Sequence, residues 1–370
     1  MTRKNKLMQF VAILFLTLFT FYSHAKAPEE KKLLIYNWED YLPQDVLDDF
    51  EKETGIHVVY DVFDSNETLE ARLLSGPSGY DVVFPSSSPY FARQLVAGAF
   101  QKLDHSKLSN LSEVSSTLLK LLKSVDQGNQ YGVPYLWGTS GFAYNKESLE
   151  SLMPEAPKDS LAMLFDPAVV SQFKACGVSM IENPSDLFDA ALLYLGKNPN
   201  PTSMNDVEAA AKLLRTVRPY IAKFVTSQVS SELANGDLCL CQCLSLEAFM
   251  AQQRTKEAKQ PFTIVYRTPK EGTEVWCDMM AIPHDAPHPD NAHKFINFIL
   301  HPEIMARITN ATYAANPVDK SKLWVSEDIR NSTVIFPNLK KLPRIYMQQF
   351  ATREIEKHRL RLWLQIKAKR

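Results

Sequence analysis

The chain has 370 residues, of which 45% are hydrophobic, and its 41 basic and 42 acidic residues give a formal net charge of −1. This apolar content excludes an intrinsically disordered protein, and the balanced charge gives no reason to expect a nucleic-acid partner. The length allows a sizeable core and predicts about two domains.

Residues 1–25 have the pattern of a secretory signal peptide. Arg3, Lys4 and Lys6 precede an apolar stretch, and Ser23-His24-Ala25 places small residues where a signal peptidase cuts. An uncleaved anchor would have a similar pattern, but the apolar stretch is short for a membrane span. We therefore expect an exported mature chain that begins at Lys26, with 38 basic and 42 acidic residues once the three basic residues are removed.

The first predicted elements alternate between strands and helices. We expect strands at residues 32–36, 57–62 and 81–84, and helices at residues 43–53 and from about 64 to 74. This order is typical of a parallel sheet covered by helices, in which ligands bind beyond the carboxyl ends of the strands. Two polar segments lie there, YNWEDY at residues 36–41 and PSSS at residues 85–88.

A second lobe is predicted to begin at the apolar segment 135–145, where Gly138 and Gly141 provide flexible points. It should contain helices near residues 184–195 and 207–217 and a strand around the cysteines at 239–243. We expect the strands at residues 262–266 and 276–282 to return to the first lobe. Residues 353–370 form a basic helix with an apolar stripe.

The five cysteines of an exported chain allow one or two disulfides and leave at least one thiol unpaired in the monomer. They are Cys176, Cys239, Cys241, Cys243 and Cys277. A zinc site is the alternative for the three that alternate, but zinc ligands are usually spaced as C-x2-C, so we expect no metal site.

The sequence offers no residue on which to base an enzyme. It lacks a P-loop, a Gly-x-Gly-x-x-Gly segment and a Gly-x-Ser-x-Gly segment. His284 and His288 have the spacing of a helical metal pair, but Pro283, Pro287 and Pro289 interrupt any helix there, which favours a loop with incidental histidines. We expect neither a cofactor nor a metal.

The YNWEDY segment places two carboxylates between large aromatic residues, Trp38 and Tyr41. Aromatic faces and carboxylates both attract a cation with an apolar body. The alternative is that the aromatic residues belong to the core and the acids begin a helix.

Over nearly the whole mature chain, the sequence resembles the periplasmic polyamine-binding proteins of bacterial ABC importers, and most of all their putrescine-binding members. The segments that carry this resemblance are YNWEDYLPQDVLDDFEKETGIHVVYDVFDSNETLE at residues 36–70, GYDVVFPSSS, VPYLWGTSGFAYN, LYLGKNPN, LANGD, PKEG, AIP and YAAN. The resemblance implies an α/β fold of type II, with two lobes joined by crossing segments and a ligand cleft between them.

Residue by residue, the resemblance implies nine ligand contacts, together with Glu39 and Leu244 as candidates and a Cys176–Cys239 disulfide. The nine are Trp38, Asp40, Tyr41, Ser86, Asp186, Glu247, Trp276, Asp278 and Tyr313. A polyamine is a methylene rod with ammonium groups, and each ammonium has three donors and no acceptor. Carboxylates for its ends and aromatic walls for its rod therefore suit it.

Three departures from the family pattern bear on the ligand. Leu244 stands where the family has an aromatic residue, and Glu39 adds a negative charge where Ser or Thr is usual. Asn183 and Ser88 stand where the spermidine binder has an acid and a tyrosine, which favours a diamine over a triamine. The ligand expected is therefore putrescine, with spermidine, agmatine or cadaverine as alternatives.

The resemblance also implies the organisation and the partners. We expect a first lobe at residues 26–134 plus about 260–316, and a second lobe at residues 135–259 plus about 317–370. The protein is expected to be a periplasmic monomer that delivers its polyamine to an inner-membrane ABC permease. A diverged sensor that binds a protein partner, or a secreted hydrolase, is the alternative from another class.

Overall fold

The computed structural model describes residues 29–225 and 228–368, so the predicted signal peptide lies outside the described residues. The compact unit Lys31–Arg370 contains all the described helices and strands. No helix of the described residues is both long enough and apolar enough to cross a membrane.

One path of paired strands runs through the whole unit, in the order β2-β1-β3-β9-β4-β7-β5-β6. Strand β10 pairs with β9, and β8 pairs with β4. The strands are β1 (Lys32–Trp38), β2 (His57–Phe63), β3 (Val82–Val83), β4 (Gly132–Asn145), β5 (Val178–Met180), β6 (Lys223–Phe224), β7 (Leu240–Leu244), β8 (Ile264–Arg267), β9 (Thr273–Ala281) and β10 (Ile345–Tyr346).

The first half of the unit is built on β1, which pairs in parallel with both β2 and β3. Its helices are α2 (Gln44–Thr54), α3 (Asn66–Leu74), α4 (Ala92–Val96), α5 (Ser116–Leu122), α13 (Pro289–Ile299) and α14 (Pro302–Thr312), with short helical turns η1 (Ser87–Phe91), η2 (His105–Lys107) and η3 (Ser109–Glu113). The apolar side chains of α2 and α13 meet over the sheet, where Phe50 packs edge-on against Phe295. Gly55 ends α2 in a left-handed conformation with φ 66°, which glycine adopts without strain.

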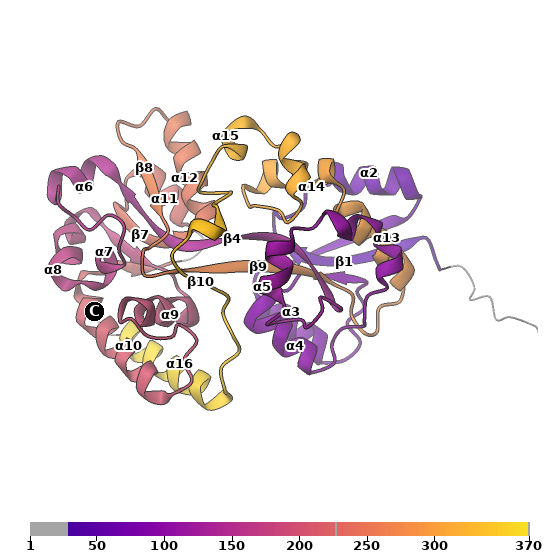
Figure 1. The fold of residues 1–370 in the computed structure, drawn as a ribbon, viewed down its shortest axis with the longest axis horizontal. Helices are drawn as coiled ribbons and strands as arrows, with labels where there is room; N and C mark the ends of the chain where they lie inside the picture. The colour runs from indigo at the N-terminus through magenta and orange to yellow at the C-terminus, as the bar shows by residue number, and fades with distance from the viewer. Residues whose placement is uncertain (1–28, 226–227, 369–370) are drawn as a thin grey trace, which may run out of the picture. The chain divides into compact units, whose positions relative to one another are not determined.

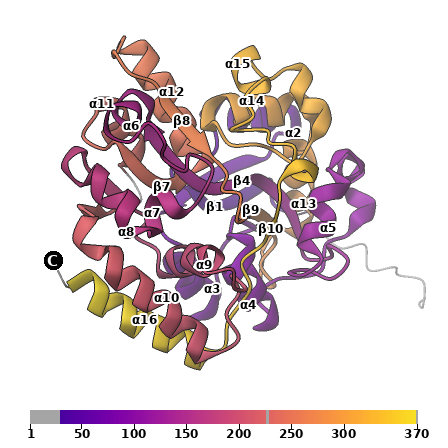
Figure 2. The ribbon, with the colours of Figure 1, turned by 60° about the vertical axis from the view of Figure 1, so that its left-hand side comes forward.

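The second half is built on β7 and β5, which are parallel, and on the C-terminal part of β4. Its helices are α6 (Lys146–Leu152), α7 (Ala162–Phe165), α8 (Pro167–Val170), α9 (Pro184–Tyr194), α10 (Met204–Val217), α11 (Val229–Asn235), α12 (Ser245–Glu257) and α16 (Arg353–Ala368), with η4 (Ser171–Cys176) and η5 (Arg218–Tyr220). Helix α16 lies along α10 and α9 (Figure 1 and Figure 2). Its apolar stripe, with Trp363 packed edge-on against Phe224, is buried there.

Two long antiparallel strands, β4 and β9, connect the halves (Figure 1). The start of β4 pairs with the end of β9, which on its other side pairs with β3. The last residues of β4 pair with β8 on one side and β7 on the other. The fold is thus the two-lobed α/β fold expected from the sequence. The lobe boundaries stay a prediction, although β8 pairs with the part of β4 that belongs to the second half.

The segment after α14 contains η6 (Asp319–Leu323), α15 (Glu327–Arg330) and η7 (Leu339–Lys341) before β10. Val325, Ile329 and Ile335 are buried in the same apolar cluster as Phe63 and Leu69. Their packing favours placing this segment with the first lobe, whereas the sequence placed residues from 317 onward with the second.

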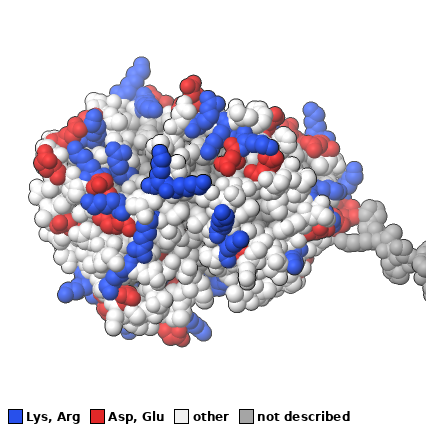
Figure 3. Space-filling model, in the orientation of Figure 1, with Lys and Arg blue, Asp and Glu red and all other residues white. Residues whose placement is uncertain are grey.

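The Cys176–Cys239 disulfide is present, with the two Cα atoms 5.5 Å apart, as expected. Cys241, Cys243 and Cys277 are free and buried. Among the described residues no group of histidine, cysteine or acidic side chains is arranged to hold a metal ion. Figure 3 shows basic and acidic side chains interspersed on one face of the molecule, in keeping with the nearly balanced charge.

Candidate polyamine-binding site

The central part of the sheet brings polar and aromatic side chains to one face. Successive side chains of a strand point to opposite faces, so Glu274, Trp276 and Asp278 of β9 share a face. Gly138 of β4 lies opposite Trp276. Because directly paired residues also share a face, Ser140 and its β7 partner Leu244 extend the same surface.

Asp278 is the buried acid at the first-lobe end of this face. Only 4% of it is exposed, and it accepts a hydrogen bond of 2.7 Å from the Ser86 hydroxyl. Asn66, in the first turn of α3, donates to Ser86 Oγ and accepts from Ser86 N, which fixes the serine. Burial raises the pKa of Asp278 to about 7, against the opposing effect of the serine bond.

Aromatic side chains lie beside this acid. Trp38 donates its indole N–H to the Phe84 carbonyl at 2.9 Å, and its ring lies 4.6 Å from Phe63 and 6.3 Å from Tyr41 between centroids. The Tyr135 hydroxyl donates to the Tyr41 carbonyl, which holds the turn after β1. Burial, followed by the charges of Asp278 and Glu247, raises the pKa of Tyr41. Tyr41 therefore lies within electrostatic reach of acids from both halves.

The second half supplies two more acids from the first turns of helices. Glu247 of α12 accepts the Leu244 N–H at 2.8 Å, and Asp186 of α9 accepts from Gln348 at 3.2 Å. Burial raises the pKa of Glu247 to about 7 and that of Asp186 to about 6. The charge of Asp186 adds to the shift of Glu247, so these two acids are neighbours.

A cleft of about 620 Å³ lies between elements of both halves. Trp38, Asn66 and Tyr90 line it from the first half, and Asp186 and Leu244 line it from the second. This volume is in the range of small-molecule sites.

Within the described part of the chain, the three acids of the site form no ion pair, although the charge of Arg359, which also lines the cleft, lowers the pKa of Asp186 against the effect of burial. Across residues 29–225 and 228–368, no lysine, arginine or histidine forms an ion pair with Asp278, Glu247 or Asp186. Buried carboxylates without a cation are costly when ionised, which is why their pKa values rise. The arrangement is suited to a cationic ligand that ionises them on binding.

The profile of a bacterial family, the extracellular solute-binding proteins, matches residues 45–333. The chain belongs to this family. A putrescine-binding periplasmic protein of Pseudomonas aeruginosa is 41% identical over 93% of this chain and 94% of its own length. A putrescine-binding periplasmic protein of Escherichia coli is 39% identical over 92% of this chain and 93% of its own. Among solved structures, a spermidine/putrescine ABC transporter protein of Listeria monocytogenes, described as putative, superposes with a TM-score of 0.80 at 30% identity, covering 92% of this chain and 100% of its own.

The other predicted contacts of this solute-binding protein lie in varied surroundings. Asp40 and Glu39 are exposed in the turn after β1, where Asp40 adopts φ 57°. Tyr313 ends α14 in a left-handed conformation and packs against Phe249 of α12, 5.5 Å between centroids. Trp276 lies over Gly138, and its indole N–H is buried without a protein partner.

Sequence reasoning missed several polar residues of this solute-binding protein. Glu274 and Gln242 lie on the same face, and Asn66 and Gln348 hold predicted contacts in place. Alternation along the strand could have revealed Glu274, because it is two residues before Trp276 and shares its face. The predicted strand began at residue 276, whereas β9 begins at Thr273.

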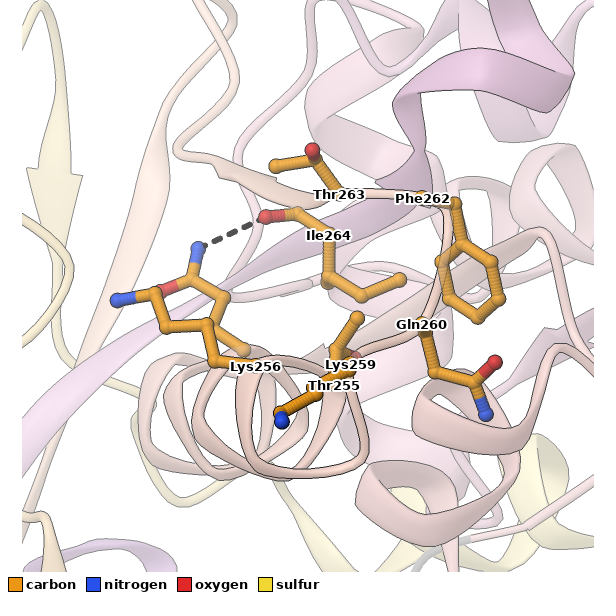
Figure 4. A pocket seen from close by; sticks show the side chains of 8 residues that line it. Thr255, Lys256, Lys259, Gln260, Phe262, Thr263 and Ile264 are labelled. Carbon is orange, nitrogen blue, oxygen red and sulfur yellow. Dashed lines mark hydrogen bonds between the residues drawn. The ribbon is translucent and has the colours of Figure 1, made fainter.

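Two other features do not suit an amine. His288 and His293 serve the fold, since His288 Nδ1 lies 3.0 Å from buried Asp81 and His293 Nε2 accepts from Asp104 N. A separate hollow of about 670 Å³ between α12 and β8 has Lys256 and Lys259 on its lining and no acid (Figure 4). Its positive charge would repel a polyamine.

Proposed function

We propose that this chain is an extracytoplasmic receptor that captures putrescine or a closely related polyamine and delivers it to an ABC permease. The observation that supports this most strongly is a set of three acids, buried Asp278 on the sheet face and half-buried Glu247 and Asp186 in the first turns of helices, none of which forms an ion pair among the described residues. The relatives named as putrescine-binding periplasmic proteins support the same ligand, the periplasmic location and a role other than catalysis.

The ligand contacts in this proposal are those predicted from the sequence. One ammonium bonds Asp278, close to Ser86 and Asp40, and the other bonds Glu247 and Asp186. The methylene rod lies against aromatic walls from Trp38, Tyr41, Trp276 and Tyr313, and each cation–aromatic contact contributes roughly 0.5 to 2 kcal/mol. Leu244 contributes an apolar wall without a ring.

A hinge motion between the two lobes accompanies capture. The ligand shifts the population toward the closed form because its two ends bond acids that belong to different lobes. The first lobe in this proposal comprises residues 26–134 and the later chain from about residue 268 to about 340, because β8 pairs with the second-half part of β4 and the segment after α14 packs with the first lobe. The monomer presents the closed form to the permease.

Calorimetric titration of the mature protein tests this function, after unfolding and refolding to remove any amine carried through purification. The panel is putrescine, cadaverine, agmatine, spermidine and spermine. Tight binding led by putrescine is expected. Binding led by another amine would keep the class and change the ligand, and the absence of heat with every amine would overturn the function in favour of a diverged sensor.

A further inference from the structure

A small cavity lies next to the cleft, toward the second-lobe end of the sheet face. Its volume is about 20 Å³, and its lining includes Ser140, Asp186, Gln242, Glu274 and Tyr346. A volume of this size holds one water-sized group. Asp186 lines both the cleft and the cavity, so the two are adjacent.

Gln242, which lines this cavity, has an unused acceptor. It is 3% exposed, and its Nε2 donates to the Asp186 backbone carbonyl at 3.4 Å. That bond fixes which end of the amide is the oxygen, because a carbonyl can only accept. The oxygen, Gln242 Oε1, is buried and has no hydrogen-bond partner among the described residues. A buried acceptor left unpaired in this way costs free energy, which a bound donor would recover.

Glu274 adds a carboxylate to the same cavity. It is 7% exposed, accepts one hydrogen bond of 2.9 Å from Ser140 Oγ, and forms no ion pair with any described residue. Three acceptor side chains therefore line the cavity, the amide of Gln242 and the carboxylates of Glu274 and Asp186. Arg359 forms its ion pairs with Asp189 and Glu356, and its charge also acts on Asp186.

We propose that this cavity binds one ammonium head group of a triamine, with Glu274 and Gln242 as the residues that select the longer ligand. An ammonium group has three donors and no acceptor, which matches a cavity lined by the Gln242 carbonyl and two carboxylates. This inference rests on the proposed function and names two contacts beyond those predicted for a diamine.

The spacing along β9 favours a triamine. Glu274 and Asp278 share a face four residues apart, which is about 13 Å along a strand. An extended diamine with four methylenes spans about 6 Å between its nitrogens, and a triamine with one further three-carbon arm spans about 11 Å, from standard bond lengths and staggered torsions. Of the two, only the longer amine can extend from Asp278 to the vicinity of Glu274.

The test compares spermidine and putrescine binding by calorimetry in the refolded full mature protein. In Glu274→Gln, which keeps the side chain's shape, the dissociation constant for spermidine should rise at least about 10-fold, the loss expected for a charged hydrogen-bonding partner. The dissociation constant for putrescine should stay within about 2-fold, since a diamine bonded to Asp278 is too short to reach Glu274. Asp159→Asn is the matched control, because it removes the same charge from an exposed acid outside the site.

The variant Gln242→Leu removes the unpaired acceptor and should lower the affinity for spermidine more than the affinity for putrescine. It provides the same test if Glu274→Gln does not fold. The inference is overturned if the wild type binds putrescine but not spermidine. It is also overturned if the variants lower the affinities for both amines equally, or change neither affinity. Failure of the proposed function looks different, because the wild type itself would then bind no amine.

Discussion

The two ends of the sheet face are built differently. At the first-lobe end a single buried acid, Asp278, is held by a serine and flanked by the rings of Trp38 and Tyr41. At the second-lobe end several acids lie close together, and burial, followed by the charge of Asp186, raises the pKa values of Glu247 and Glu274. In the proposed binding mode, the first end holds one cation against an aromatic wall, and at the second end a cation offsets the repulsion between neighbouring carboxylates.

Acidification acts on both ends at once and should have the largest effect. Asp278 and Glu247 have pKa values of about 7, so both take up protons as the pH falls from 8 to 5 and no longer attract an ammonium. We expect putrescine affinity to fall at least about 100-fold over this range, measured by calorimetry. An affinity that is flat between pH 5 and pH 8 would contradict the role of both acids.

The ligand-free protein should respond to pH in the opposite sense. Folding raises these carboxyl pKa values above those of the unfolded chain, so the groups stabilise the fold at low pH. This contribution is lost as the pH rises through about 6 to 7. The rise in melting temperature caused by putrescine should therefore be larger at pH 8 than at pH 5.

Removing the acid of the first-lobe end alone should be nearly as damaging. In Asp278→Asn the affinity for putrescine should fall about 100-fold, because loss of one partner of a buried charge pair costs about 2 to 5 kcal/mol. Asp61→Asn is the control, since Asp61 is an exposed acid of β2 that only accepts from Tyr80. If the two substitutions lowered putrescine affinity equally, Asp278 would not be a ligand contact.

Removing one carboxylate at the second-lobe end should lower putrescine affinity less than removing Asp278. In Glu247→Gln the affinity should fall only about 10-fold, because Asp186 remains next to the ammonium and the charge-assisted bond lost contributes about 1.5 kcal/mol. Calorimetry on both variants compares the ends directly. A larger loss for Glu247→Gln than for Asp278→Asn would reverse the comparison.

Restoring an aromatic residue at the second-lobe end should strengthen binding. Leu244 and Trp38 both line the cleft. In Leu244→Trp a new cation–aromatic contact of about 0.5 to 1 kcal/mol should tighten putrescine binding by a factor of roughly 2 to 5. Leu244→Met, which adds no ring, serves as the control and should leave affinity nearly unchanged.

The exposed acid next to the first-lobe end should matter least. Glu39 lies on the surface, where solvent and salt screen its charge. In Glu39→Ser, putrescine affinity should weaken by no more than about 2-fold, and the difference should vanish at high salt. A loss that persists at high salt would show that Glu39 contacts the ligand directly.

Much of the fold could be predicted from local patterns. The strand at Lys32, the helix that Gly55 ends and the strand of alternating cysteines follow from hydrophobic period and turn chemistry. The position of β8 could not be predicted in this way. Its pairing with β4 at Phe142–Asn145 joins residues about 120 positions apart, so no local pattern indicates it.

The candidate site, like the fold, was predicted only in part. Asp278 was predicted through the family resemblance, and its burial and its bond to Ser86 agree with a buried ligand contact. Gln242 was not predicted, because a single glutamine between two cysteines of a strand carries no signal of its own. It lies on the opposite face of β7 from Cys241 and Cys243. Glu274 could have been found by extending the alternation of β9 back by two residues.

A crystal structure of the refolded protein with putrescine tests the central claim most directly. The account predicts one nitrogen within hydrogen-bonding distance of Asp278 and the other within the same distance of Glu247 or Asp186, with the rod against Trp276. A diamine bound anywhere else, or bonded to only one of these ends, would contradict it.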